Sequence, residues 1–147
     1  MKRIVLFASF ILVLLCGCNN SPRPQASDES VIEAKEIIKN TTLETNKMCP
    51  VNYGLMVMES VNYDYIENEV NFNYIVEQLN KGDNLKAIKE GILIVLKSDY
   101  VANSQSQIFY DAIIKARAKM IYNYYTNEGK TLKIELLSSE IESSIHN

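Results

Sequence analysis

Apolar and polar residues alternate between positions 70 and 77, and this alternation restricts the fold more than any other feature of the sequence. A period of two predicts a strand with one buried face, whose apolar positions are Val70, Phe72, Tyr74 and Val76. A preceding strand is predicted because apolar residues occupy odd-numbered positions before this segment, namely Leu55, Val57, Val61 and Tyr63. The polar link 64–68 would join the two strands as an antiparallel hairpin.

A second hairpin is predicted between residues 120 and 136. Met120, Tyr122 and Tyr124 alternate with their neighbours, and the same period returns in residues 131–136. The link between these strands contains Gly129, which can adopt the positive φ of a bulged loop. Four strands in two hairpins are therefore expected.

Two helices are predicted at the ends of the folded region. Ser30 and Glu33 have capping-box spacing, and helical periodicity follows over residues 31–43 or a little beyond. Ser139 and Glu142 repeat this spacing and predict a short C-terminal helix.

Two further helices are predicted between the hairpins. Asp83 is the expected N-cap of the first, which carries a broad apolar stripe. Gly91 costs this helix about 1 kcal/mol relative to alanine, which indicates close packing against a neighbour. The run 91–96 could also form a short buried strand, but the apolar stripe begins before it and favours a helix. The second of these helices spans about 104–117, with Ile108 among its inward-facing residues.

These elements follow one another in the order α-β-β-α-α-β-β-α. This order predicts a single α+β domain over residues 30–147. We expect one four-stranded antiparallel sheet built from the two hairpins, with the helices packed mainly on one of its faces.

The N-terminus carries an apolar segment from Ile4 to Leu15, directly after the positively charged Lys2 and Arg3. Its 12 residues are too few to cross a hydrocarbon core of about 30 Å, and they have the length of a signal peptide. An uncleaved N-terminal anchor is the alternative, but it gives no reason for the cysteine that follows the segment.

Residues 15–18, Leu-Cys-Gly-Cys, resemble the lipobox of bacterial lipoproteins. Leu15 stands at its first position, Gly17 at the third and Cys18 at the invariant one. Cys16 departs from the pattern, because the second position is more often Ala, Ser, Thr or Val. The resemblance implies that residues 1–17 are a signal peptide that is removed, and that Cys18 receives a diacylglycerol thioether and an N-acyl chain. Several acyl chains would hold the mature protein permanently at the membrane.

The resemblance also bears on location. In the sorting rule of Gram-negative lipoproteins, Asp after the lipidated cysteine retains a protein in the inner membrane, so Asn19 favours the outer membrane. Both leaflets of that membrane are compatible with the sequence. Residues 18–29 include two prolines and no large apolar side chain, and they predict a disordered tether between the lipid and the domain.

Charge and cysteine content limit the partners of the mature chain. Removal of Lys2 and Arg3 leaves 13 basic and 18 acidic residues, a net charge of −5. The two signs are interspersed, so binding to nucleic acid or directly to anionic lipid is disfavoured. Cys49 would be the one remaining thiol and is expected to be a small buried hydrophobic residue. An intermolecular disulfide and a redox-sensitive thiol are its alternatives.

No catalytic residue, metal site or cofactor other than the lipid is predicted. The one histidine, His146, is next to the C-terminus, and no phosphate-binding glycine motif occurs. Two pairs of carboxylates, Glu67 with Glu69 and Glu140 with Glu142, are interpreted as solvated surface groups. Distant carboxylates that meet in the fold could still form a hydrolase site.

Tyrosine is the residue type that points to a binding surface. Six tyrosines fall on or beside the predicted hairpins: Tyr63, Tyr65, Tyr74, Tyr122, Tyr124 and Tyr125. Tyrosine is favoured both in strands and at interfaces, so sheet packing and partner binding both predict this set. The possible partner surface consists of Tyr63, Tyr65, Tyr124 and Tyr125.

The first functional hypothesis is a lipid-anchored, non-catalytic module that binds another envelope protein as an inhibitor, immunity protein or assembly accessory. The alternatives are a carboxylate-based hydrolase of envelope glycans and a small-ligand carrier, which would need an apolar cavity between helices and sheet. Residues 46–50 and 60–64 are similar to a segment of small secreted bacterial proteins, and this similarity implies no activity.

Overall fold

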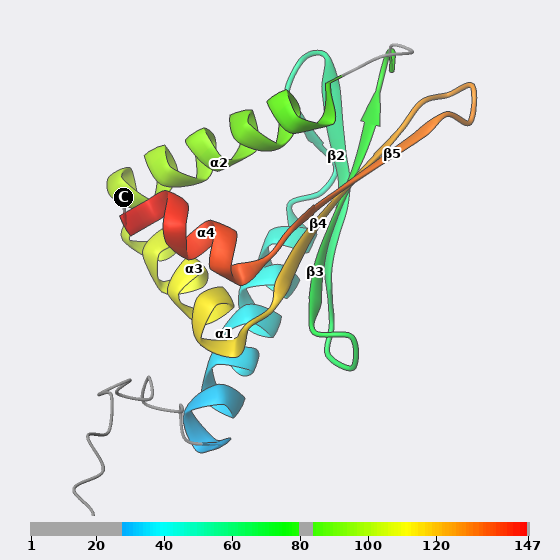
Figure 1. Ribbon diagram of the computed structural model, residues 1–147. Coiled ribbons are helices and arrows are strands. Elements are labelled where there is room, and N and C mark those ends of the chain that lie inside the picture. The colour runs from blue at the N-terminus through cyan, green and yellow to red at the C-terminus, as the bar shows by residue number, and fades with distance from the viewer. Residues whose placement is uncertain (1–27, 80–83, 147) are drawn as a thin grey trace, which may run out of the picture.

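The computed structural model describes residues 28–79 and 84–146, which form one α+β domain (Figure 1). Within these ranges the predicted order of elements is confirmed, with one short additional strand, β1. The elements are α1 (Asp28–Lys47), β1 (Val51–Asn52), β2 (Met56–Asp64), β3 (Glu69–Val76), α2 (Leu85–Ala102), α3 (Ser104–Ala116), β4 (Lys119–Tyr125), β5 (Thr131–Leu136) and α4 (Ser138–His146).

In the described residues the sheet has five strands in the order β1-β2-β3-β4-β5. Both predicted hairpins are confirmed, because β2 pairs with β3 and β4 with β5 in antiparallel fashion. The expectation of a wholly antiparallel sheet needs one correction: β3 and β4 are parallel. The chain leaves β3, passes through α2 and α3, and returns to the end of the sheet where β3 began. There the Lys119 N–H donates to the Asn68 carbonyl oxygen at 3.0 Å.

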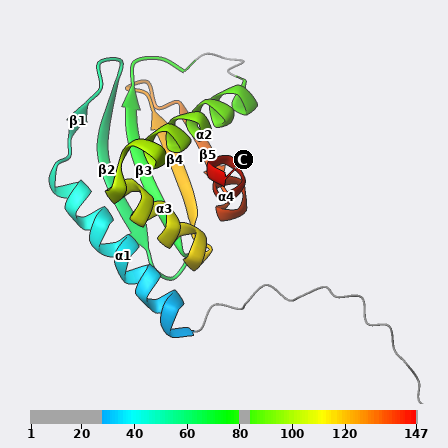
Figure 2. The same ribbon diagram turned by 90° about the vertical axis from the view of Figure 1, so that its left-hand side faces the viewer.

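The helices of the described residues lie on one side of the sheet, as predicted (Figures 1 and 2). α1 packs on α3 and beside β2, and α2 packs mainly on α3 and α4. Ile38 of α1 and Ile113 of α3 are fully buried where these helices meet the sheet. The strands supply further large buried side chains of the core, which include Val61, Val70, Met120 and Leu136, and α4 adds Ile141.

A β-bulge at Glu59 changes which residues of β2 face the helices. Met58 pairs with Tyr74 and Ser60 with Asn73, so Glu59 has no partner on β3. Because of this extra residue, Met58 and Val61 are both buried although they differ in parity. The predicted set of inward residues on β2 is therefore wrong before the bulge, and Leu55 lies outside the strand with 77% of its surface exposed.

The helix termini differ from the predicted ones. α1 begins at Asp28, so Ser30 lies inside the helix and is not its N-cap. Asp83 lies outside the described residues, and Asn84 caps α2 by accepting from the N–H groups of two residues in its first turn. At α4 the capping contact joins the Leu137 N–H to a Glu140 carboxylate oxygen at 2.8 Å, instead of involving Ser139.

Two predictions about the helix interiors also need correction. Gly91 is not closely packed, because a Cβ added there would meet no atom within 4 Å. Ile108 of α3 is half exposed, whereas the neighbouring Phe109, Ala112 and Ile113 are buried. The inward stripe of α3 is thus narrower than the sequence pattern indicated.

Candidate functional site

Four stacked aromatic rings on β3 and β4 form a wall that faces the helices. The parallel register places Phe72 opposite Tyr122 and Tyr74 opposite Tyr124. The ring centroids of these pairs lie 5.0 and 5.4 Å apart, with interplanar angles of 13° and 20°. Stacking of this kind contributes roughly 0.5–1.5 kcal/mol per pair beyond area burial and holds the rings in a fixed plane.

An apolar groove of about 1070 Å³ opens between this wall, α2, α3 and the C-terminal end of α1. We call it the main groove. Its rim includes apolar side chains that are largely solvent-exposed, such as Met48 (67%), Val95 (65%) and Tyr53 (55%). Its floor includes the four stacked rings and Met120. Water therefore meets a larger apolar surface here than scattered exposed residues would give.

The main groove stays open because α2 is held from its other sides. Lys89 of α2 forms an ion pair of 2.7 Å with Glu140 of α4, and Ser144 donates to the Leu93 carbonyl oxygen at 3.2 Å. Gly91 lines the groove without filling it. The main contacts of α2 are consequently with α3 and α4, and of the described α2 residues that line the groove only Leu96 is buried.

Electrostatically the main groove is almost neutral. Burial raises the pKa of Tyr122 well above its ordinary value, and it also raises the pKa of Tyr74. The pKa of Tyr110 is raised by burial and by the nearby Asp99 carboxylate. These hydroxyls are therefore neutral at physiological pH. Among the described residues that line the groove, Asp99 is the only one with a charged side chain.

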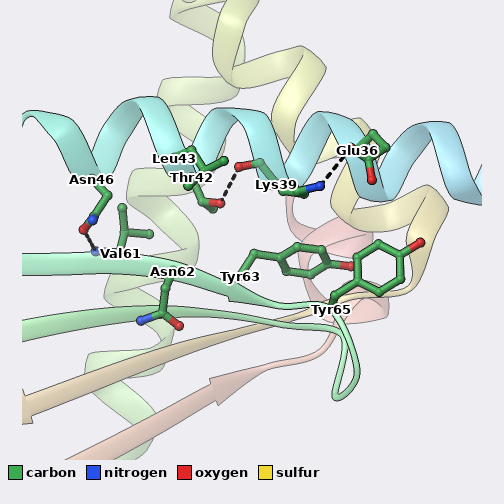
Figure 3. A pocket seen from close by; sticks show the side chains of 9 residues that line it. All are labelled: Glu36, Lys39, Thr42, Leu43, Asn46, Val61, Asn62, Tyr63 and Tyr65. Atoms are coloured by element: carbon green, nitrogen blue, oxygen red, sulfur yellow. Dashed lines mark hydrogen bonds and ion pairs between the residues drawn. The ribbon is translucent and has the colours of Figure 1, made fainter.

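A second, smaller groove of about 500 Å³ lies between α1 and the outer edge of β2 (Figure 3). Tyr63 and Tyr65 lie side by side in it, with ring centroids 5.9 Å apart in an edge-on arrangement. The Lys35 ammonium sits 4.6 Å from the centre of the Tyr65 ring. At the other end, the Val61 N–H donates to the Asn46 side-chain oxygen at 3.0 Å and closes part of the strand edge.

The four tyrosines of the predicted partner surface thus lie in three places. Tyr63 and Tyr65 share the second groove, and Tyr124 lines the main groove. Tyr125 is exposed on β4, and strand alternation directs it to the opposite face of the sheet from Tyr124. Their role in binding stays a prediction. The residues predicted for processing and lipidation lie outside the described residues: Lys2, Arg3, Leu15, Gly17 and Cys18.

The predicted carboxylate pairs are not simply solvated groups, because one member of each forms an ion pair with a lysine and the Glu69 side chain is only 17% exposed. Glu69 bonds to Lys119 at 2.6 Å, and Glu140 to Lys89 at 2.7 Å. Burial disfavours ionisation of Glu140, but Lys89 and the Leu137 N–H outweigh it and lower the pKa of this carboxyl.

His146 makes an edge-on ring contact with an aromatic residue of α2. The described part of the chain contains no group of three potential metal ligands.

Cys49 is half-buried rather than buried, and its thiol lies 3.7 Å from the Thr45 carbonyl oxygen. Burial raises the pKa of this thiol, against a smaller opposite effect of the Val61 backbone. A raised pKa keeps the sulfur protonated and lowers its reactivity.

As to membrane insertion, none of the described helices combines the length and apolarity that a transmembrane span requires.

The main groove was missed from the sequence, although α2 carries a signal for it. Apolar residues occur on several sides of this helix, and Leu85, Ile94 and Val95 are each more than half exposed. A helix that is apolar nearly all round is normally covered on all sides. Of these three residues only Val95 lines the main groove, and its exposure marks the side of α2 that lacks a packing partner inside the described domain.

No protein-family model matches the sequence, and no curated protein matches it at a significant level. Solved structures do share its fold. The pilotin EpsS of the Vibrio vulnificus type 2 secretion system superposes with a TM-score of 0.55 and 13% identity, over 81% of this chain and 97% of that one. The type II secretion system pilotin AspS of Vibrio cholerae gives 0.51 and 11%, over 76% and 95%. At these identities the likeness concerns the fold.

Proposed function

We propose that this protein is a membrane-anchored, non-catalytic binding module of the bacterial envelope that holds a segment of another envelope protein. The main groove is the observation that carries this proposal. An open apolar groove with a rigid aromatic floor gains free energy when a ligand covers it. Its volume of about 1070 Å³ is sufficient for several apolar side chains at once.

The likeness to two pilotins supports a more specific role. Both are pilotins of type II secretion systems, and both share the fold of this domain. We therefore infer that the partner belongs to an envelope assembly such as a secretion apparatus, and that this protein assists its assembly or placement. At 13% and 11% identity the fold supports this role, and the partner itself must be identified by experiment.

The membrane anchor is the second part of the proposal. A diacylglycerol on Cys18 would tether the domain, and Asn19 favours the outer membrane. Membrane fractionation of a Cys18→Ala variant tests this. We expect the variant to leave the membrane fraction or to accumulate unprocessed, and to lose incorporation of labelled fatty acid. Firm membrane association of a variant that is as fully processed as wild type would contradict the lipoprotein proposal.

Filling the main groove tests the binding function. Gly91→Trp would place a large side chain at the groove without meeting a neighbouring atom at Cβ. Ile94→Trp is the matched control, because Ile94 is on the same helix, 69% exposed, and does not line the groove. Tagged full-length protein would be isolated from membranes, and its bound proteins would be quantified by mass spectrometry.

We expect a stoichiometric partner that is retained by wild type and by Ile94→Trp and is lost from Gly91→Trp. Thermal melts would verify that all three proteins are folded under the conditions of the assay. An identical set of bound proteins in all three samples would show that the groove does not bind them, and the proposal would fail.

The same groove also favours a second candidate function, the carriage of a small apolar ligand. Pockets of this class have volumes of about 300–1,000 Å³ and are mostly apolar. Native mass spectrometry of the protein released from membranes distinguishes the two. A bound small molecule of constant mass that is lost in Gly91→Trp would indicate a carrier, whereas a bound polypeptide would indicate the module proposed above.

A further inference from the structure

Among the described residues that line the main groove, one side chain is charged, and it has no described partner of opposite charge. Asp99 is in the last turns of α2, and its carboxylate accepts a hydrogen bond of 3.1 Å from the Tyr110 hydroxyl of α3. The ion pairs within the described residues involve seven lysines, none of which contacts Asp99. One neutral hydroxyl thus satisfies one oxygen of a half-buried carboxylate.

The other described residues that line the groove carry no positive charge. It consists of apolar and aromatic side chains with neutral hydroxyls and amides, the latter from residues such as Asn103 and Gln105 beside Asp99. When a partner covers this surface, water is removed from the carboxylate, and an unpaired charge would then oppose binding. A positive charge on the partner removes this penalty and adds a charge-assisted hydrogen bond.

We propose that the segment bound in the main groove is an apolar polypeptide segment that carries one Lys or Arg, and that Asp99 selects this basic residue. The inference rests on the proposed binding function and names the chemistry of the partner. The apolar floor provides affinity for the apolar side chains of the segment. Asp99, at the α2–α3 end of the groove, fixes the register in which the segment lies.

The chain contains a natural control for Asp99. A second tyrosine–aspartate pair joins the same two helices with the donor on α2: the Tyr100 hydroxyl donates to Asp111 at 3.1 Å. The two pairs have the same sequence separation of 11 residues and the same bond length, but Tyr100 and Asp111 do not line the groove. Asp99→Asn and Asp111→Asn therefore remove equivalent charges, one inside the groove and one outside.

The test uses full-length lipidated protein in lipid nanodiscs as bait for a display library of random segments of about 20 residues. Selections are made on wild type, Asp99→Asn, Asp111→Asn and Gly91→Trp, after removal of binders to empty nanodiscs. We expect wild type and Asp111→Asn to enrich apolar segments with one basic residue. Asp99→Asn should enrich apolar segments without this preference, and Gly91→Trp should not capture either class.

For one selected segment, the Kd should rise about tenfold on Asp99→Asn and should remain unchanged on Asp111→Asn. Replacement of the basic residue of the segment by methionine should raise the Kd for wild type by the same factor of about ten. It should leave the Kd for Asp99→Asn unchanged. This peptide variant keeps the test decisive even if Asp99→Asn folds poorly.

The outcomes separate the two proposals. Apolar segments that depend on an open groove but show no basic preference would overturn the role of Asp99 and leave the binding function intact. Segments that bind Gly91→Trp as well as wild type, or a selection without any binder, would overturn the binding function and this inference together.

Discussion

Asn68 joins three elements at the start of the parallel pair, and its replacement should cost more stability than an ordinary turn residue. Its side-chain oxygen accepts a 2.6 Å bond from the Tyr63 hydroxyl, and its side-chain nitrogen donates to the Ala116 carbonyl oxygen at 2.9 Å. Its backbone has a φ of 56°, which asparagine adopts more readily than alanine.

The expected magnitudes follow from these contacts. Each side-chain hydrogen bond contributes about 1 kcal/mol, and alanine at positive φ costs about 1 kcal/mol more. Asn68→Ala should therefore lower the free energy of unfolding by about 3 kcal/mol, since it loses both bonds and is strained. Asn68→Gly loses the bonds without the strain and should cost about 2 kcal/mol. Tyr63→Phe removes one bond and should cost about 1 kcal/mol.

Urea unfolding at 25 °C would measure these differences from the linear dependence of the free energy on denaturant. The slopes should agree among the variants, so that midpoints report stability alone. A loss below about 1 kcal/mol for Asn68→Ala would show that Asn68 does not hold the β2–β3 turn to the end of α3. Equal losses for the alanine and glycine variants would refute the assigned backbone strain.

Three further predictions concern pH, α2 and its contact with α4. Burial raises the pKa of Tyr63 to about 12 and that of Tyr122 well above 10, so the unfolded chain releases these protons at lower pH than the folded one. The free energy of unfolding should therefore fall as pH rises from about 10 through 12, as urea titrations would show. The fall should be less steep in Tyr122→Phe. Gly91→Ala should raise the free energy of unfolding by about 1 kcal/mol, because alanine favours the helix and its Cβ would meet no atom within 4 Å. A lower free energy of unfolding in the same titration would mean that this face of α2 is packed. Lys89→Met should lower the free energy of unfolding by about 0.5 kcal/mol near neutral pH, because it removes the ion pair with Glu140. The pKa of Glu140 is lowered in the fold, so this loss should vanish as pH falls through that pKa. A loss that does not depend on pH would contradict the ion pair.

The hairpins could be predicted from the sequence because the signals for them are local. Val70, Phe72, Tyr74 and Val76 occupy every second position of β3, and the turns at 65–68 and 127–130 separate the paired strands. The order of elements and the covered face of the sheet follow from the same periodicities. The short strand β1 was missed, since two residues are too few to show a period.

Features that depend on distant pairing could not be predicted in this way. The bulge at Glu59 exists because Ser60 pairs with Asn73, and a sequence pattern cannot show this shift. The parallel contact of β3 with β4 depends on the path of the chain through α2 and α3. This contact stacks Phe72 on Tyr122, so the floor of the groove could not be predicted before the register was known.

The position of the groove is consistent with a partner that approaches from the side away from the lipid. The predicted tether enters the domain at Asp28, the first residue of α1, whereas Thr41, Thr42 and Thr45 of the same helix line the groove. At about 1.5 Å per residue, these positions are separated by roughly 20–25 Å along the helix. A segment that occupies the groove would therefore contact the end of the domain opposite to the tether. Membrane attachment and partner binding could then proceed together, as the proposed function requires.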